Sequence, residues 1–430
     1  MTTLKAVRGT RDLLPPETAL WNRIEATARA VFARYNFGEI RTPIFEDTAL
    51  FARGVGEETD IVSKEMYTWE DRARAQSEKT QSLTLRPENT AGVVRAYIEH
   101  QLGETGQLQK LYYIGPQFRR ERPQKGRYRQ FSQIGAEVLG PPSAGSESPI
   151  RDAEVLEMLA TLLDELGITG WTLELNSVGS AADRARYNDT LRAALVPVVG
   201  QMCTDCQRRA VTNPLRVLDC KVPADQPIID TLPVIADSLD EASRAHFAAV
   251  TAALDAAGVP YTRNHRLVRG LDYYTRTTFE FTHGGLGAQN ALLGGGRYDG
   301  LSEAIGGPKA PGIGFAMGED RLVLTLQSLE SASPQLADAF IAPLGESLNA
   351  AALSLARELR RAGLTIELGE GSFRLKKSFE AADKTARNIV ILGEDELQSG
   401  ILTVKTFATA IQTKVPRTEL AVFLKKPASE

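Results

Sequence analysis

The residues best suited to chemistry in this chain form a cationic segment between two apolar stretches, in the run 111–140, LYYIGPQFRRERPQKGRYRQFSQIGAEVLG. Residues 119–129 contain six Arg or Lys and a single acid, Glu121. Pro123 and Gly126 interrupt the segment, and neither residue suits the middle of a strand or helix. The run therefore predicts two strands joined by a basic loop, a hairpin that could hold a polyphosphate.

The strand that returns from this loop alternates in character, and a period of two places its side chains on opposite faces. One face holds Phe131, Gln133 and Glu137, and the other holds the core-like Ile134, Ala136 and Val138. On the incoming strand, Arg119 shares a face with Gln117. A guanidinium, a ring, an amide and a carboxylate on one surface would suit a small zwitterion together with a polyphosphate. An exposed hairpin with a solvated tip fits the same residues, and periodicity alone leaves both open.

Composition bounds the kind of protein to expect. The chain has 430 residues, 43% of them apolar, which suffices for two or three domains with a substantial core. Its net charge of -4 gives no global attraction to nucleic acid, so a polyanion site must be a local basic patch. The first residues lack the apolar core of a signal peptide, and no apolar run approaches membrane-spanning length. These features predict a cytoplasmic protein with no membrane association.

Three cysteines lie close together in the sequence, at Cys203, Cys206 and Cys220. Zinc sites usually have four ligands, and no histidine of the chain lies at a customary spacing from this cluster. The histidines are His100, His246, His265 and His283. We therefore expect reduced, partly buried thiols and no metal, for want of a fourth ligand.

The elements that must position the hairpin begin with a helix over about 17–35. A strand near Pro43 and a strand that leads to Arg86 are expected next. The following helix has Glu88 and Thr90 among its early residues. An acid at that point either contacts a ligand or complements the helix dipole, and the residues leave this choice open.

Further helices and strands are expected after the hairpin. These are a helix over about 151–166, a strand over 171–179, a helical Ala-rich stretch over about 181–258, a glycine-rich turn within 292–301, and a strand feeding a helix over 311–326. Residues 267–281 look strand-like at both ends, and within them Arg269 and Asp272 need partners because unpaired buried charge is costly. The end of the chain alternates between strands near 340–344, 364–368, 388–392 and 401–404 and helices near 347–362 and 373–386, which indicates a small α/β domain.

The run 118–140 closely resembles motif 2 of histidyl-tRNA synthetases, which are class II aminoacyl-tRNA synthetases. Other stretches resemble the same family in the expected order: 8–17 its opening segment, 36–46 motif 1, 84–97 a substrate-binding segment, 267–281 and 292–301 two histidine-specific motifs, and 311–326 motif 3. The resemblance implies an α+β fold, with a class II antiparallel-sheet catalytic domain over 1–327 that contains a helical insertion at about 181–258. It further implies a linker at 328–335 and an α/β anticodon-binding domain at 336–430.

The resemblance also implies substrates and the residues that contact them. It assigns Arg119 and Arg269 to catalysis, Glu88, Thr90, Gln133, Glu137, Tyr273, Tyr274 and Tyr298 to histidine, and Arg119, Glu121, Arg127, Phe131 and Arg321 to ATP. The implied reaction joins L-histidine to ATP as histidyl-adenylate and passes histidine to tRNA(His), with Mg²⁺ held by ligands that the sequence does not identify. Motif 1 implies a homodimer, and a basic helix with Arg374, Lys376, Lys377 and Lys384 is available for tRNA.

Two other functions were weighed against this one. Catalytically inert paralogues serve as the regulatory subunit of ATP phosphoribosyltransferase in histidine biosynthesis, but they generally lack the C-terminal domain and have degraded motifs. This chain keeps Arg119, Arg269 and Arg321, and about 95 residues follow the linker. A nucleic-acid-binding module without catalysis would leave the polar pocket unexplained.

Overall fold

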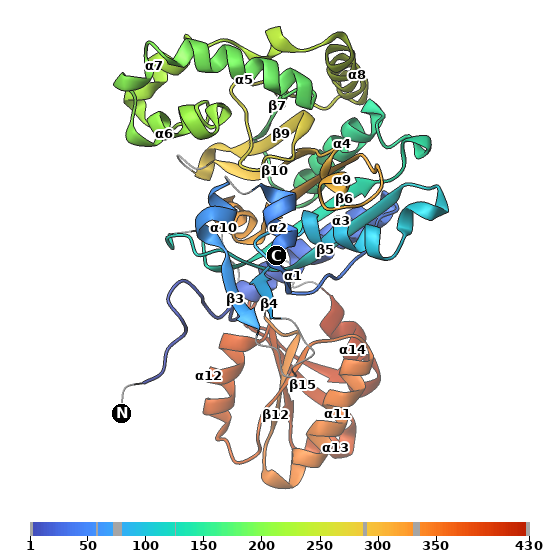
Figure 1. The fold of residues 1–430 in the computed structure, drawn as a ribbon. Coiled ribbons are helices and arrows are strands. Elements are labelled where there is room, and N and C mark those ends of the chain that lie inside the picture. Colours follow the sequence, from blue (N-terminus) through green and yellow to red (C-terminus); the bar gives the residue numbers. More distant parts are fainter. Residues whose placement is uncertain are drawn as a thin grey trace. The chain divides into compact units, whose positions relative to one another are not determined.

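The structure is a computed structural model that describes residues 3–56, 59–71, 80–124, 126–286, 290–329 and 336–426. The chain divides into two compact units, Met1–Ser331 and Ala332–Glu430 (Figure 1). The division falls within the stretch expected to be a linker, of which residues 330–335 lie outside the described residues. Each unit has its own sheet and its own apolar core.

An eight-stranded sheet is the centre of the first unit. Its strands, in spatial order, are β1 (Gly38–Glu39), β5 (Gln109–Phe118), β6 (Gln130–Leu139), β11 (Gly312–Gly318), β10 (Ala291–Arg297), β9 (Thr275–His283), β7 (Trp171–Ser177) and β8 (Thr262–Arg263). Neighbours pair antiparallel except at the two edges, where β1 and β8 run parallel to β5 and β7. The predicted hairpin is β5 and β6, and it lies beside β11 from the far end of the unit's sequence.

The largest apolar core lies against this sheet. Four helices contribute to it: α1 (Glu17–Arg34), α4 (Pro149–Glu165), α8 (Glu241–Ala257) and α10 (Glu319–Leu329). Ile134, Ala136 and Val138 of β6 are buried in this core, which confirms the alternation expected for that strand. The other face of β6 is left for the polar side chains.

Smaller elements complete the catalytic face of the unit. They are α2 (Thr48–Val55), α3 (Thr90–Glu99), α9 (Leu301–Ala304) and a three-stranded sheet of β2 (Phe45–Asp47), β4 (Gln81–Leu85) and β3 (Tyr67–Asp71). After β4, the Arg86 guanidinium donates to the backbone carbonyls of Pro116 and Thr42, each at 2.9 Å. These bonds hold the end of β4 against the end of β5.

The stretch expected to be helical is confirmed as such. It contains α5 (Ala181–Leu195), α6 (Thr204–Thr212) and α7 (Gln226–Ile229) and ends with α8. A capping box begins α5, in which Ser180 and Asp183 accept from each other's backbone N–H groups. A separate core that includes Tyr187, Leu191 and Cys206 supports these helices.

Two local expectations for the first unit are wrong. Residues 267–274 form no strand, because the backbone N–H of Asp272 donates to the last carbonyl of α2 (3.3 Å) instead of joining a neighbouring strand. The three glycines at 294–296 lie inside β10 rather than in a turn. A Cβ on Gly295 would overlap the carbonyl oxygen of Gly314, so these glycines allow a close approach between strands.

The second unit is the α/β domain that the sequence indicates. Its five-stranded sheet has the order β13 (Ile366–Leu368), β12 (Ala339–Pro343), β14 (Asn388–Leu392), β15 (Ile401–Thr406) and β16 (Gln412–Pro416). Its helices are α11 (Asn349–Arg361), α12 (Leu375–Thr385), α13 (Glu394–Ser399) and α14 (Arg417–Lys425). Of these, β16, α13 and α14 were not expected. Among the helices described in both units, none is long and apolar enough to cross a bilayer.

One buried acid stands out at the start of α10. Glu319 is fully buried, and this burial raises its pKa to about 8, with a further rise from the nearby Glu25 and an opposing bond from Ser132. Because the folded-state pKa lies above the ordinary value of 4.5, the protonated side chain stabilises the fold fully below that value. The contribution is lost as the pH rises through about 8.

We expect Glu319→Gln to remove this pH dependence, because the amide stays neutral at every pH. Between about pH 6 and pH 8, the variant should lose less unfolding free energy than the parent chain, by about 2 kcal/mol. Urea unfolding at the two pH values measures the difference. Glu241→Gln, at an exposed position at the start of α8, is the control and should behave like the parent. Equal losses in all three proteins would contradict the argument.

Candidate active site

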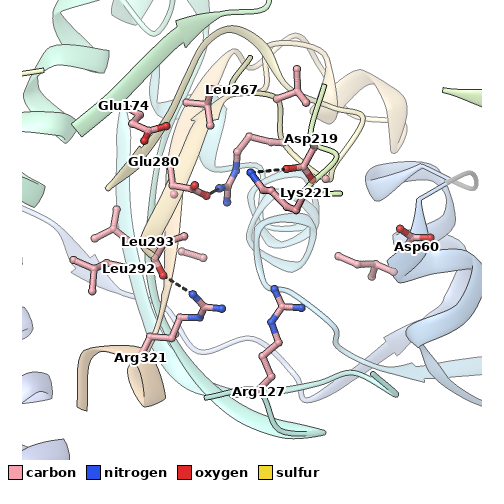
Figure 2. Close-up of a pocket in the computed structure, with 18 of the residues that line it drawn as sticks. Asp60, Arg127, Glu174, Asp219, Lys221, Leu267, Glu280, Leu292, Leu293 and Arg321 are labelled. Carbon is pink, nitrogen blue, oxygen red and sulfur yellow. Dashed lines mark hydrogen bonds and ion pairs between the residues drawn. The ribbon is translucent and has the colours of Figure 1, made fainter. Parts of the chain in front are cut away.

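A cavity of about 800 Å³ lies over the polar face of the hairpin. Its lining includes seven residues that the sequence assigns to substrates: Arg119, Glu121, Arg127, Phe131, Gln133, Arg269 and Arg321. Figure 2 shows Arg127 and Arg321 extending into this cavity from its lower side, facing Asp219 and Lys221. The volume falls in the range of sites for small molecules and cofactors.

Arg119 is held at the point where the hairpin leaves β5. Its backbone N–H donates to the Arg129 carbonyl (2.9 Å), which continues the pairing of the two strands past Phe118. Its Nε donates to the Pro87 carbonyl (2.9 Å), and its Cζ lies 5.3 Å from the centroid of the Phe131 ring. These contacts fix the plane of the guanidinium, whose Nη groups suit an anionic oxygen.

Two more arginines give the cavity its positive character. Arg127 Nη1 lies 3.3 Å from Glu121 Oε2, and Arg321 Nη1 donates to the Ala291 carbonyl (2.7 Å; Figure 2). Burial lowers the pKa of Arg321, and the charge of Arg127 lowers it further. An anion between these two arginines would relieve that cost, so the arrangement favours a ligand with negative charge.

Arg269 has the partner that the sequence requires but does not identify. Its Nη1 lies 2.5 Å from Glu280 Oε1 of β9. In the sheet, Glu280 pairs with Gly294 of β10, and a Cβ on Gly294 would overlap the Arg269 guanidinium. The available signal was that Glu280 is the only acid in β9, between Phe279 and Phe281. Both phenylalanines are buried in the core, which leaves Glu280 on the face of the cavity.

Glu137 is the centre of a second, buried group of side chains. Its two carboxylate oxygens accept from the hydroxyls of Thr90 and Tyr298, each at 2.7 Å. Burial raises the pKa of Glu137 to about 8, and repulsion from Glu88 adds to this while the two hydrogen bonds oppose it. Gly314 pairs with Glu137 on the adjacent strand, and a Cβ there would overlap the carboxylate.

Glu88 caps the helix that the sequence placed beside it. Its carboxylate accepts from the backbone N–H groups of Thr90 (2.8 Å) and Ala91 (3.0 Å) at the start of α3. The helix-supporting interpretation is therefore observed, and contact with a ligand stays a prediction. Thr90 links the two acids, because its N–H donates to Glu88 and its hydroxyl donates to Glu137. Two buried carboxylates this close create a negative potential that suits a cationic group.

Tyrosine rings close this buried group. The ring centroid of Tyr273 lies 4.8 Å from that of Tyr274 and 6.0 Å from that of Tyr298. None of these rings lines the 800 Å³ cavity, and Tyr273 instead lines a separate cavity of about 500 Å³. Of the residues expected at histidine, only Gln133 lines the main cavity. Within the described residues its Oε1 is buried without a hydrogen-bond partner.

The sequence reasoning missed one wall of the cavity. Arg216, Asp219 and Lys221 line it from the helical insertion, and Figure 2 shows the Asp219 and Lys221 side chains meeting at its rim (3.6 Å). No local signal in those residues points to a site, because charged side chains are common in such segments. Gln117 of β5 is also completely buried, and neither of its amide atoms has a partner among the described residues.

Comparison with known proteins accounts for nearly the whole chain. A family model described as histidyl-tRNA synthetase matches residues 9–322, and one described as an anticodon binding domain matches residues 338–427. The histidine–tRNA ligase of Koribacter versatilis is 73% identical over 98% of this chain and 96% of its own length. That of Solibacter usitatus is 57% identical over 98% of this chain and 99% of its own.

A solved structure agrees with these matches. The crystal structure of the apo histidyl-tRNA synthetase of S. aureus superposes with a TM-score of 0.78, at 37% identity, over 99% of this chain and 100% of that one. The comparisons confirm the α+β fold, with a class II catalytic domain followed by an α/β anticodon-binding domain. The chain therefore belongs to the histidyl-tRNA synthetase family of class II aminoacyl-tRNA synthetases.

Proposed function

We propose that L-histidine is activated with ATP in the 800 Å³ cavity and is then transferred to the 3'-terminal ribose of tRNA(His). The observation that carries this proposal is the convergence of Arg119, Arg269 and Arg321 on one cavity, next to the buried acids Glu88 and Glu137. The arginines suit a triphosphate, and the acids suit the cationic end of an amino acid. A site with both can bring the carboxylate of one substrate to the α-phosphorus of the other.

ATP is bound by the hairpin and α10. Arg119 contacts the α-phosphate, Arg127 contacts the outer phosphates, and adenine stacks between Phe131 and Arg321. The planar ring and the planar guanidinium support such stacking. The chain has no Walker A sequence, so phosphate binding by arginines takes the place of a glycine-rich loop.

Arg269 stabilises the transition state. A carboxylate oxygen of histidine attacks the α-phosphorus, the bond to the β-phosphate oxygen breaks, and pyrophosphate leaves. Negative charge gathers on the α-phosphoryl oxygens as this happens, and a positive group fixed beforehand stabilises it most effectively. The ion pair with Glu280 fixes Arg269 in this way.

The histidine side chain is read by groups of the buried cluster. Glu137 and Tyr274 bond to the two imidazole nitrogens, while Glu88, Thr90 and Gln133 surround the α-ammonium group. Tyr273 and Tyr298 form the walls. Because burial holds a proton on Glu137 up to about pH 8, its carboxyl can donate to an imidazole nitrogen at neutral pH.

Mg²⁺ fits the donors of the cavity. The carboxylates of Glu121 and Glu280 line the same space as the arginines, and Mg²⁺ in such sites takes one or two carboxylates together with substrate phosphates. These two residues would hold it. When bound, the ion neutralises charge on the departing pyrophosphate.

The proposal includes a cytoplasmic homodimer that binds tRNA(His) through its C-terminal unit. Exposed Ile44 and Phe45 follow the edge strand β1 in motif 1, and such apolar exposure supports an interface there. For tRNA, Lys376 on α12 is highly exposed. A regulatory subunit of ATP phosphoribosyltransferase is less well supported, because the anticodon-binding domain is present and the arginines are in the cavity.

We expect ATP–pyrophosphate exchange to require L-histidine and Mg²⁺. A site that hydrogen-bonds a polar side chain rejects analogues that lack it by about 10⁴ or more, because its buried polar groups are otherwise unpaired. Exchange measured separately with all twenty amino acids tests this. Equal rates with several of them, or no exchange with histidine, would refute the proposal.

Arg269→Ala should slow adenylate formation by about 10² to 10³ while ATP binding changes little, because the charge acts in the transition state. Single-turnover kinetics and equilibrium ATP binding separate the two effects. Arg263→Ala, at an exposed position on β8, is the matched control and should react at the parental rate. An unchanged rate in Arg269→Ala would exclude this role.

A chain that ends after Ser331 should keep histidine-dependent exchange and lose tRNA charging efficiency by at least about tenfold. All residues proposed for activation lie in the first unit, and each lost phosphate contact lowers the salt dependence of tRNA binding by about 0.7 to 0.9 in log–log slope. Exchange, charging and tRNA binding are measured on truncated protein that is folded and dimeric.

A full-length variant with Ala at Arg374, Lys376, Lys377 and Lys384 is the companion to the truncation, and it should show part of the same loss of charging. Parental charging by the truncated protein would show that the second unit does not read tRNA. Loss of exchange in a folded truncated dimer would show that the second unit takes part in activation.

A further inference from the structure

The three cysteines of the insertion meet a fourth residue that the sequence did not suggest. Cys203, Cys206, Cys220 and Asp225 each offer one ligand atom, and these atoms all lie within 4.8 Å of one another. Cys203 directly precedes α6, Cys206 lies in its first turn, and Asp225 directly precedes α7. The expectation of no metal was based on a missing fourth ligand, and Asp225 now fills that position.

The spacing of the ligand atoms suits a single ion. Tetrahedral coordination at a zinc–sulfur distance of about 2.3 Å places two sulfurs about 3.8 Å apart. The sulfurs of Cys203 and Cys220 are 3.9 Å apart. A disulfide requires about 2.05 Å, so the pair is not bonded in this structure.

The surroundings of Asp225 are unusual for an acid. It is almost completely buried, and within the described part of the chain it forms no ion pair with a basic side chain. Its carboxylate accepts from the backbone N–H of Cys203 (3.1 Å) and from the thiol of Cys220 (3.3 Å). A buried carboxylate without a counter-charge is costly, and a bound cation would provide that charge.

The thiols have the environment of metal ligands. Burial raises the pKa of Cys206 and of Cys220, so without a cation both remain protonated. A divalent ion reverses this preference, because a coordinating thiol is deprotonated outright. The backbone N–H of Val222 already donates to the sulfur of Cys220 (3.4 Å), a contact that favours a thiolate.

We propose that Cys203, Cys206, Cys220 and Asp225 bind one Zn²⁺ ion in a closed structural site. Three thiolates and a carboxylate complete four-coordination without water, and soft sulfur ligands favour zinc over Mg²⁺.

The ion ties the start of α6 to the segment 217–226. That segment also supplies Leu218, Asp219, Lys221 and Gln226 to the wall of the 800 Å³ cavity. Binding zinc therefore holds one wall of the active site in place.

The test measures metal in the full-length chain, purified under reducing conditions without added metal. We expect about one zinc per chain by elemental analysis. Asp225→Asn and Cys206→Ser should each lower this by about fivefold or more. Asp189→Asn, an exposed Asp in α5, is the matched control and should keep the parental content.

A second measurement on the parent chain keeps the test valid if the variants fail to fold. After the ion is removed by a chelator under reducing conditions, Co²⁺ should restore a tetrahedral spectrum with thiolate charge-transfer bands, and zinc should protect all three thiols from a thiol reagent. Three opposite results would overturn the proposal. They are absence of zinc with no tetrahedral cobalt spectrum, a Cys203–Cys220 disulfide in the purified protein, and full zinc retention in Asp225→Asn.

Discussion

β6 buries an apolar core on one face and an ionisable carboxyl on the other, and the rest of the first unit depends on this division. Ile134, Ala136 and Val138 fix the register of the strand, because a slip by one residue would turn them out of the core. The same register places Phe131 and Gln133 at the cavity and Glu137 in the buried cluster. Packing on one side thus fixes the positions of the polar groups on the other.

Position along β6 also divides the site by charge. Near the basic loop the strand meets guanidinium groups, and towards Leu139 it meets the two buried carboxylates. The two regions are stabilised differently: the arginines reach solvent in an open cavity, while Glu137 is held by Thr90 and Tyr298 in a dry interior. A substrate with opposite charges at its two ends has one orientation that satisfies both regions.

Sequence periodicity predicted the strands, the helices and the arginines of the cavity, because each follows from a local pattern. It failed where the cause lies far along the chain. The strand-like residues 267–274 are irregular because α2 takes the backbone bond of Asp272, and the glycines of β10 are needed by side chains on other segments. Glu280 and Asp225 were missed for the same reason, since a lone acid has meaning only beside the group that it meets in space.

The strand order of the large sheet also constrains how the chain acquires its fold. β6 pairs with β11, so that Leu139 faces Gly312, and the whole helical insertion is synthesised between the two. A nascent chain that has just released the hairpin from the ribosome exposes the unpaired edge of β6 until β11 emerges. Long-range pairing of this kind is slow, and exposed edges invite association with other chains. Synthesis of this protein therefore passes through a long interval in which its central strand needs protection from other unfinished chains.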